Sequence, residues 1–475
     1  MKLNKIITLL LTFLLIQSCS KDDLAELNVD PNTSPSALPN QLLTAGMGYF
    51  GIALDGYMNE DNAILAQYWA GGPGVNIIDL ERYAVEPGDY NTEWRYSYEQ
   101  ALTDLKFAID NGNGAQAVAA EILSIAIFQY LVDLYGDIPY SEALQGANGI
   151  LTPSYDNDED IYPLLLERLD NALAKIGTED VLGSEDIIYG GDLGQWEKFA
   201  NSLKLRMLMR QSTVKDVSVA VQNLISEGNF ITTAADIAKI PFNGGTGNLN
   251  PQYARREQGV GQFYVASNTI VTVMDMLGDP RLDVIFDPAV NTGTVVGMIQ
   301  GNVNDLITPS KDDFSFPSGV AYGTNNDVLL LTHWEVAFLL AEAEAKFGTA
   351  NKAKAMYDQA ISDHFSYIGA GSASAYLSTD ASYPTTGDLQ TQLSAIGVQK
   401  WISMNGLQET EGWIESRRFD LPNARIFTNG IFVTPTRTVL GAGIFPSIRL
   451  YPQNEIDYNP NTPARSLTDK VFWDN

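Results

Sequence analysis

Three segments of the sequence combine aromatic rings with amide, carboxylate or guanidinium groups, a mixture of side chains suited to binding neutral sugars. The C–H face of a sugar ring stacks on an aromatic ring, and its hydroxyls form hydrogen bonds with planar polar groups. All three segments are predicted to be loops, where binding residues concentrate. The candidate ligand-binding residues are Trp69, Asn76, Asp79, Arg82 and Tyr83 in the first loop, Gln252, Tyr253, Arg255 and Tyr264 in the second, and Phe314, Phe316 and Tyr322 in the third.

Paired carboxylates offer an alternative chemistry, because a glycoside hydrolase needs two of them about 5 to 9.5 Å apart. With 58 acidic residues, neighbouring acids arise by chance, for example Asp22 with Asp23, Asp312 with Asp313, and the run 158–160. Neighbouring acids in a loop are usually solvated, and no pair stands out from the others. A secreted glycoside hydrolase therefore stays open as an alternative, without assigned catalytic residues.

Metal-dependent and nucleophilic catalysis lack their usual sequence signatures. The two histidines, His333 and His364, belong to no His-Glu-x-x-His motif, and there is no Gly-x-Ser-x-Gly motif or phosphate-binding loop. A calcium ion could bind an Asp- and Asn-containing loop such as 156–160, although EF-hand spacing is missing. We therefore expect no metal site, and no residue is assigned a catalytic role.

The elements that must position these loops are predicted to be mostly α-helices with few short strands. Hydrophobic periodicity places a helical scaffold in residues 41–230 and 327–420, a loop-rich insertion in 231–326, and one domain over 41–475. The final 50 residues are predicted to be loop and short strand. The expected helices span 41–54, 63–69, 90–109, 118–135, 161–176, 195–211, 217–226, 329–347, 352–365, 389–404 and 409–419.

Several side chains in these helices are expected to be structural. An apolar stripe at helical spacing runs from Trp94 through Tyr98 to Leu105, and Gly136 is expected to end the very apolar helix 118–135. Small residues around an aromatic, at Ala353, Tyr357 and Ala360, match the second half of a tetratricopeptide repeat. We also expect core positions for Trp94, Trp196, Trp334, Trp401 and Trp413, and buried ion pairs for Arg206, Arg210, Arg417 and Arg418.

The N-terminus predicts secretion and a lipid anchor. Lys2 and Lys5 precede an apolar run at 6–16, which has the length of a signal-peptide core and is too short to cross a bilayer. Ile16-Gln17-Ser18-Cys19 resembles a bacterial lipobox, and lipidation would account for Cys19 being the only cysteine of the chain. We expect a signal peptide at 1–18 and a lipidated tether at 19–40. The following Ser-Lys-Asp-Asp resembles a surface-export signal of Bacteroidetes lipoproteins.

The composition limits the partners. The chain has 29 basic and 58 acidic residues, a formal charge of −29, which disfavours nucleic acid, anionic lipid headgroups and strongly acidic polysaccharides. Twenty-two tyrosines and seven tryptophans supply ring faces, although rings are also ordinary core residues. The charge favours neutral glucans, mannans or chitin-type chains as ligands.

Taken together, segments along nearly the whole chain resemble the SusD/RagB family of outer-membrane glycan-binding lipoproteins of the Bacteroidetes. Their order and combination carry the resemblance. They are LNVDPN at 27–32, DLYGDIPYSEA at 133–143, WEKFANSLKLR at 196–206, EVAFLLAEA at 335–343, QKW at 399–401, Arg417 with Arg418, and RLYP at 449–452.

The resemblance implies tetratricopeptide-like helix pairs that support a loop-rich ligand face. It implies capture of an oligosaccharide or polysaccharide and its transfer to a SusC-like TonB-dependent transporter in the outer membrane, without catalysis or an obligatory cofactor. The family's ligand contacts follow no fixed motif, so the resemblance assigns no binding residue. A non-catalytic helical-repeat adaptor that binds peptides stays open as a second alternative, although it would not need long aromatic loops.

Overall fold

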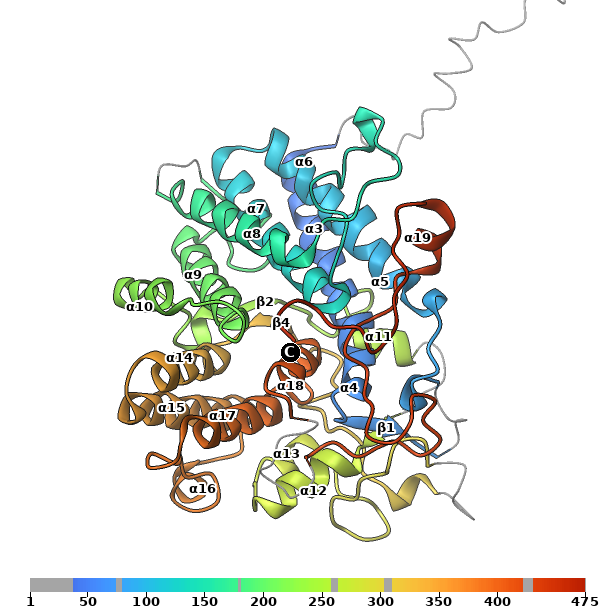
Figure 1. The fold of residues 1–475 in the computed structure, drawn as a ribbon, viewed down its shortest axis with the longest axis vertical. Coiled ribbons are helices and arrows are strands. Elements are labelled where there is room, and N and C mark those ends of the chain that lie inside the picture. The colour runs from blue at the N-terminus through green and yellow to red at the C-terminus, as the bar shows by residue number, and fades with distance from the viewer. Residues whose placement is uncertain are drawn as a thin grey trace, which may run out of the picture.

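The computed structural model describes residues 37–73, 79–177, 181–257, 264–302, 310–421 and 430–474, and its elements are mostly helical (Figure 1). The predicted fold class, mostly α with few short strands, is confirmed. Cys19, the signal peptide, most of the tether and Asn76 lie outside the described residues.

The N-terminal helices form one packed layer. The first is α3 (Pro39–Ala53), which continues through the π-helical turn η1 (Leu54–Asn59) into α4 (Glu60–Leu65). The predicted helix 90–109 is likewise a composite of α5 (Asn91–Arg95), the π-helical turn η4 (Tyr96–Leu102) and α6 (Thr103–Asn111). The stripe from Trp94 to Leu105 is buried as predicted, and α3 packs against η4 and α6.

Helix α7 (Gly114–Tyr135) lies at the centre of this layer. It begins at a capping box formed by Asn113 and Gln116 and ends at Gly136, whose φ of 72° is the conformation that glycine adopts most readily. The predicted end of this helix is therefore confirmed. Among the described residues α7 is the one helix long and apolar enough to cross a membrane, but 89% of its apolar window is buried inside the molecule. We interpret it as a core helix.

The rest of the scaffold is a series of paired helices. It comprises α8 (Asp158–Leu173), α9 (Leu193–Arg210), α10 (Ser218–Glu227), α14 (His333–Phe347), α15 (Ala350–Ile368), α16 (Ser374–Ser378), α17 (Leu389–Met404), α18 (Glu409–Arg418) and α19 (Gln453–Tyr458). Ala353, Tyr357 and Ala360 are buried where α14 and α15 pack together, as the repeat-like spacing predicts. Helix α19 lies in the final 50 residues, where we had expected only loop and short strand.

The middle of the chain is more ordered than the sequence suggests. Residues 231–326 contain helices α11 (Pro251–Glu257), α12 (Asn268–Met276) and α13 (Leu282–Ile285), together with strands β2 (Ala238–Ile240) and β3 (Tyr264–Ala266). Strand β3 pairs antiparallel with β1 (Trp69–Gly71), and β2 pairs antiparallel with β4 (Val328–Leu331). The same part of the chain also contains two short 3-10 turns, η6 (Ala234–Asp236) and η8 (Lys311–Asp313).

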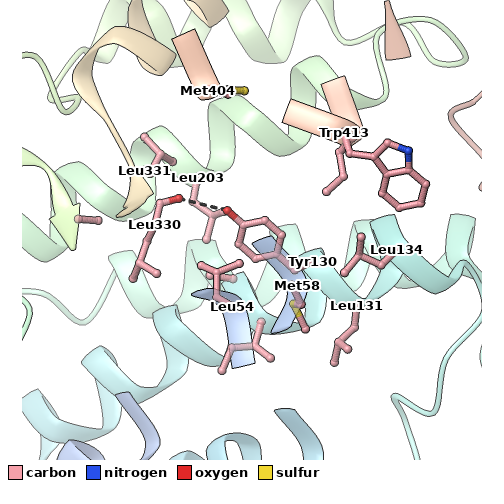
Figure 2. Close-up of a cluster of buried hydrophobic side chains, with 14 of the residues drawn as sticks. Leu54, Met58, Tyr130, Leu131, Leu134, Leu203, Leu330, Leu331, Met404 and Trp413 are labelled. Carbon is pink, nitrogen blue, oxygen red and sulfur yellow. Dashed lines mark hydrogen bonds between the residues drawn. The ribbon is translucent and has the colours of Figure 1, made fainter. Parts of the chain in front are cut away.

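One large hydrophobic cluster joins distant parts of the sequence. It extends from Leu43 in α3 to Trp473 near the C-terminus, and it includes Trp94, Trp196, Trp401 and Trp413. Trp334 belongs to a smaller buried cluster with Ile237 and Leu329. All five of these predicted core tryptophans are buried, as expected. Figure 2 shows Tyr130 of α7 among leucine and methionine side chains of η1, α9, β4 and α17, with its hydroxyl donating to the Leu330 carbonyl at 3.3 Å.

Buried ion pairs connect the helices beside this cluster. Three of the four arginines predicted to form such pairs do so, which confirms the prediction for them. Arg206 contacts Glu335 at 2.7 Å, Arg210 contacts Glu411 at 2.6 Å and Arg418 contacts Glu342 at 2.6 Å. The fourth, Arg417, is buried but donates to the main-chain carbonyls of Asp133 and Ser447. Its role is to hold main-chain turns together.

Candidate functional site

Trp69 does not offer a ring to solvent. Its side chain is 0% exposed, because strand β1 pairs with β3 and brings Trp69 opposite Ala266. Its ring packs 5.7 Å from the ring of Tyr264 and 6.4 Å from that of Tyr322, measured between centroids. The expectation of an exposed stacking ring at this position is therefore wrong, and Trp69 supports the wall behind the predicted loops.

Other predicted rings and amides are also turned inward. Tyr83 has a φ of 63°, a left-handed conformation, and its buried ring contacts Phe445 edge-on. Tyr322 and Gln252 are buried as well, contrary to the expected exposure. The half-buried Tyr253 lies 5.3 Å from the Tyr322 ring.

The third loop packs on the small sheet formed by β1 and β3. Phe314 and Phe316 are half-buried against a cluster of Ala70, Val265 and Met298. Arg82 in the first loop is partly exposed, and it forms an ion pair with the exposed Asp79 at 2.7 Å. Phe314 and Phe316 therefore pack on the sheet, and Arg82 and Asp79 form a separate ion pair at the surface.

A cavity of about 210 Å³ brings together one residue from the first loop and two from the second. These residues are Asp79, Arg255 and Tyr264, which the sequence placed among the candidates. The cavity is smaller than the roughly 300 to 1,000 Å³ clefts that enclose drug-sized ligands, so it matches a single small polar unit. Four further polar residues line it, Glu60, Asp61, Asp89 and Tyr90, together with the apolar Leu80 and Val85.

Glu60 organises the inner wall of this cavity. Its side chain is 1% exposed and accepts a hydrogen bond from the Tyr264 hydroxyl at 3.0 Å and one from Arg255 Nη1 at 3.2 Å. Arg255 Nη1 also donates to the Gly56 carbonyl at 2.8 Å. The guanidinium is therefore held at the rim of the cavity, with its side chain still 39% exposed.

Asp61 is the carboxyl with the clearest change in acidity. Burial raises its pKa to about 6, while the positive charges of Arg449 and Arg255 lower it and the neighbouring Glu93 raises it. A carboxyl with this pKa can exist as donor or acceptor near neutral pH. The cavity has four acids and one arginine in its lining, so it favours ligands that donate hydrogen bonds through hydroxyl or amide groups.

A row of partly exposed tyrosines continues from Arg255. The Arg255 guanidinium lies 4.4 Å from the centroid of the Tyr57 ring, which stacks on Tyr96 at 5.7 Å, and Tyr96 lies 6.2 Å from Tyr49. We call Tyr49, Tyr57 and Tyr96 the tyrosine ladder. All three rings are half-buried, and Tyr57 and Tyr96 belong to the π-helical turns η1 and η4, a feature that is frequent at functional sites.

The sequence contained a signal for the tyrosine ladder that the loop-centred prediction did not use. Tyr49 and Tyr57 are eight residues apart, about 80° of rotation in a continuous helix, although the predicted helix 41–54 ends before Tyr57. Tyr96 lies between Trp94 and Tyr98 of the buried stripe, so it must point to another face. Glu60 and Asp61 gave no comparable signal, because single acids in a helix are usually solvated.

No metal centre accompanies these carboxylates in the described ranges, where no group of three or more His, Cys, Asp or Glu side chains could hold an ion. In the loop 156–160, considered above for calcium, Asp156 accepts hydrogen bonds from the main-chain N–H groups of Tyr140 and Ser141. Asn157 caps α8 there. These oxygens therefore serve local structure.

Comparison with known proteins identifies relatives of this chain. Residues 31–438 match the model of the SusD-like family, described as starch-binding and associating with the outer membrane. A SusD homologue from Bacteroides uniformis is 24% identical with a TM-score of 0.75, and the match covers 91% of this chain and 99% of that one. A chitin-binding protein is 22% identical with a TM-score of 0.75, covering 92% and 98%.

A SusD/RagB family protein from Bacteroides thetaiotaomicron is 21% identical with a TM-score of 0.74, covering 92% of this chain and 99% of that one. These likenesses show that the fold is shared. Among curated proteins, none matches this sequence.

Proposed function

Because this chain belongs to the SusD-like family of glycan-binding, outer-membrane-associated proteins, we propose that it is a surface lipoprotein that captures an oligosaccharide. The proposal includes transfer of the ligand to a SusC-like TonB-dependent transporter. The observation that supports the binding site most is the convergence of Arg255 with the tyrosine ladder and the acidic cavity.

The proposed site matches both faces of a sugar. The exposed parts of the half-buried Tyr57 and Tyr96 rings contact the apolar C–H groups beside the Arg255 guanidinium, which lies over the Tyr57 ring. The adjacent cavity offers carboxylates and the same guanidinium to the hydroxyls. Asp79 and Tyr264, two of the residues predicted from the sequence, belong to the same site under this proposal. The acidic lining favours neutral sugars over uronic or sulfated ones.

Affinity electrophoresis tests this proposal. A protein beginning at residue 20 would migrate through gels that contain soluble glucans, mannans, xylans or glycol chitin; the last is included because one similar structure is a chitin-binding protein. Retardation by one glycan is expected. Tyr57→Ala should weaken it about five- to tenfold, equivalent to the loss of about 1 to 1.4 kcal/mol. Arg255→Ala should weaken it at least tenfold, because a hydrogen bond to a charged group contributes about 1.5 to 3 kcal/mol.

Tyr458→Ala provides the matched control, because Tyr458 is 78% exposed and lies outside the site. Circular dichroism should confirm that every variant is folded. Retardation that is unchanged in the folded Tyr57 and Arg255 variants would contradict the proposed site. Wild-type protein that no glycan retards would contradict the proposed function.

The lipid anchor has its own test. Cells expressing the full chain would be labelled with a fatty acid, and the wild-type protein should carry the label while Cys19→Ser should not. Protease added to intact cells should degrade the wild-type protein if it faces the exterior. A labelled Cys19→Ser protein, or full protection from protease, would contradict the anchored surface position.

Transfer to the transporter is tested by co-purification. The full chain, solubilised in detergent from cells that express it, should retain a TonB-dependent outer-membrane protein, and the Cys19→Ser variant should retain less of it. Purification of the full chain without such a protein would contradict this part of the proposal.

One observation favours a glycoside hydrolase as the rival function. Asp61, with a pKa of about 6, lies in a cavity with other carboxyls, and a raised pKa is what a general acid requires. Incubation with each glycan followed by a reducing-sugar assay separates the two functions. Sugar release by the wild-type protein that Asp61→Asn abolishes would overturn the binding-protein proposal.

A further inference from the structure

A second cavity lies away from the proposed site and shares no lining residue with it. It has a volume of about 540 Å³ and is bordered by α6, α7, α8 and the segment 140–148. In Figure 1 these helices lie in the upper part of the view, whereas α11 lies to the right of the centre and β1 toward the lower right. The volume falls in the range of about 300 to 1,000 Å³ typical of small-molecule sites.

Aromatic rings and a fixed guanidinium line one side of this second cavity. The rings of Phe128 and Tyr140 meet edge to face at 5.0 Å, and the Arg168 guanidinium lies 5.7 Å from each ring centroid. Arg168 is held by two hydrogen bonds to Glu121, at 2.7 and 3.0 Å, and by one to Ser124 at 2.8 Å. This wall is therefore rigid before any ligand arrives.

The charges around the second cavity cancel. Arg168 is paired with Glu121, and Lys106 at the rim is paired with Asp110 at 2.5 Å. The amide side chains of Gln145 and Asn148 complete the polar part of the lining, opposite apolar side chains such as Leu102 and Ile109. A cavity with rings, amides and balanced charge suits a neutral ligand that has both apolar faces and hydroxyl groups.

The second cavity adjoins a third one of about 220 Å³, because Ala143, Leu144 and Gln145 line both of them. The lining of the third cavity also includes Trp94, Tyr98 and Pro139. Leu144 has a φ of 60°, a left-handed conformation that is rare for a bulky residue. Such strain persists only where surrounding structure enforces it, and it clusters at ligand sites.

Hydrogen bonds hold the chain segment around Leu144 in this conformation. Asp156 accepts hydrogen bonds from the main-chain N–H groups of Tyr140 and Ser141, and Glu142 accepts one from the Ser154 N–H at 2.7 Å. Gln145 donates from its side chain to the Ser141 carbonyl at 2.8 Å. These hydrogen bonds hold the main chain on both sides of Leu144, which lines both cavities.

We propose that the two cavities on either side of Leu144 form a second oligosaccharide-binding site, specific for a neutral sugar chain. One sugar unit lies beside Tyr140 and Phe128, the next crosses Leu144, and another approaches Trp94 and Tyr98. This inference rests on the proposed function, because it assigns the same class of ligand to a separate place. Two sites on one chain would strengthen capture of a long glycan, since the second contact becomes intramolecular.

Titration calorimetry with short sugars tests this inference. The protein beginning at residue 20 would be titrated with neutral trisaccharides of glucose, mannose, xylose and N-acetylglucosamine, each too short to bridge both sites. Ala147 is exposed on the rim of the second cavity, so Ala147→Trp should fill the cavity without disturbing the core. Leu151→Trp is the matched control, because Leu151 is 80% exposed, follows the same segment and lines neither cavity.

The wild-type protein and Leu151→Trp should bind two trisaccharides per chain. Ala147→Trp and Arg255→Ala should each bind one, with at least a tenfold loss at the altered site, and the double variant should bind none. Hydrogen exchange should slow in residues 140–150 when sugar is added to Arg255→Ala.

Each failure has a separate meaning. A single wild-type site that Arg255→Ala abolishes and Ala147→Trp leaves intact would overturn this inference and leave the proposed function standing. A single site that only Ala147→Trp abolishes would support the inference and overturn the location of the first site. Absence of binding to every trisaccharide would overturn both.

Discussion

Replacement of Arg210 by methionine should destabilise the folded protein by about 3 to 5 kcal/mol at pH 7.5. The Arg210 side chain is 0% exposed and contacts three carboxylates that come from two helices. It lies 2.6 Å from Glu411, 3.2 Å from Asp133 on α7, and within hydrogen-bonding contact of Glu415. Methionine matches the shape of the side chain but leaves these carboxylates without their shared cation.

The magnitude follows from what remains after the substitution. Burial raises the pKa of Asp133, and the charge of Arg210 offsets part of this rise. Burial would also raise the pKa of Glu415, but Arg418, Lys400 and Arg210 together hold it well below its ordinary value. In the variant, Glu415 retains Arg418 and Lys400, and Glu411 retains Arg206 at 3.9 Å. The Asp133 carboxylate loses its ion pair and keeps hydrogen bonds from neutral donors such as Tyr162 and Trp473. The loss is therefore concentrated at Asp133.

The destabilisation should shrink as the pH falls. A carboxyl whose pKa is raised in the folded state is penalised above that pKa, and the penalty is relieved when it takes up a proton. Without Arg210, the pKa of Asp133 rises further, so the folded variant binds a proton at a higher pH than the folded wild type and the unfolded chain do. The difference in unfolding free energy between wild type and Arg210→Met should therefore be smaller at pH 5 than at pH 7.5.

Urea unfolding followed by tryptophan fluorescence at both pH values measures these differences. Lys204→Met is the control on the same helix, because Lys204 pairs with Asp170 at 2.5 Å while the two side chains are 23% and 54% exposed. That exposed pair should contribute no more than about 1 kcal/mol. An Arg210→Met variant as stable as Lys204→Met at pH 7.5, or one whose deficit grows toward pH 5, would refute the electrostatic reasoning.

Two further predictions concern the candidate site and the core. Asp61, with its pKa of about 6, is an anion above that pH and then accepts hydrogen bonds more strongly. The affinity for a neutral sugar, measured by calorimetric titration, should therefore rise from pH 5 to 7.5. Asp61→Asn should abolish this pH dependence. A wild-type affinity that does not change with pH would exclude Asp61 as a ligand contact. Gly412→Ala should destabilise by about 1 to 3 kcal/mol in urea, because the new Cβ would lie 2.3 Å from the hydroxyl of the buried Tyr68. Gly88→Ala has open space around the new Cβ and should stay within about 0.5 kcal/mol of wild type; equal effects of the two glycine substitutions would contradict the packing argument.

The helical scaffold could be predicted closely where its signals were local. The predicted helix 389–404 coincides with α17, whose first turn is capped by the Asp388 side chain accepting from the Thr391 N–H at 2.8 Å. The end of α7 at Gly136 was equally evident. Such caps and stops depend on residues within about four positions of the helix end, so the sequence contains them directly.

The middle of the chain was harder to predict because its order comes from distant partners. Strands β1 and β3 have three residues each and pair Trp69 with Ala266, which are 197 positions apart. A three-residue strand has too little periodicity to be recognised alone. Residues with Gly and Asn around them were therefore interpreted as loops, although several lie in short helices and strands.

The candidate site, too, could be predicted only in part, because some of its features depend on contacts between distant residues. Asp79, Arg255 and Tyr264 were named from composition, and the fold brings them into one cavity. Trp69 and Tyr83 were named on the same grounds, but strand pairing and a left-handed backbone turned their rings inward.

The sequence by itself determined the family, the acidic character and most of the helical scaffold, because these depend on composition and on residues close together in the chain. Only the tertiary structure decided which rings remain accessible. The exposure of a ring depends on the residues that pack against it. Tyr57 packs against the exposed Arg255 and stays half-buried, whereas Trp69 packs against the buried Tyr264 and is itself buried. Both partners come from a segment about 200 residues away, and no local pattern predicts such a contact.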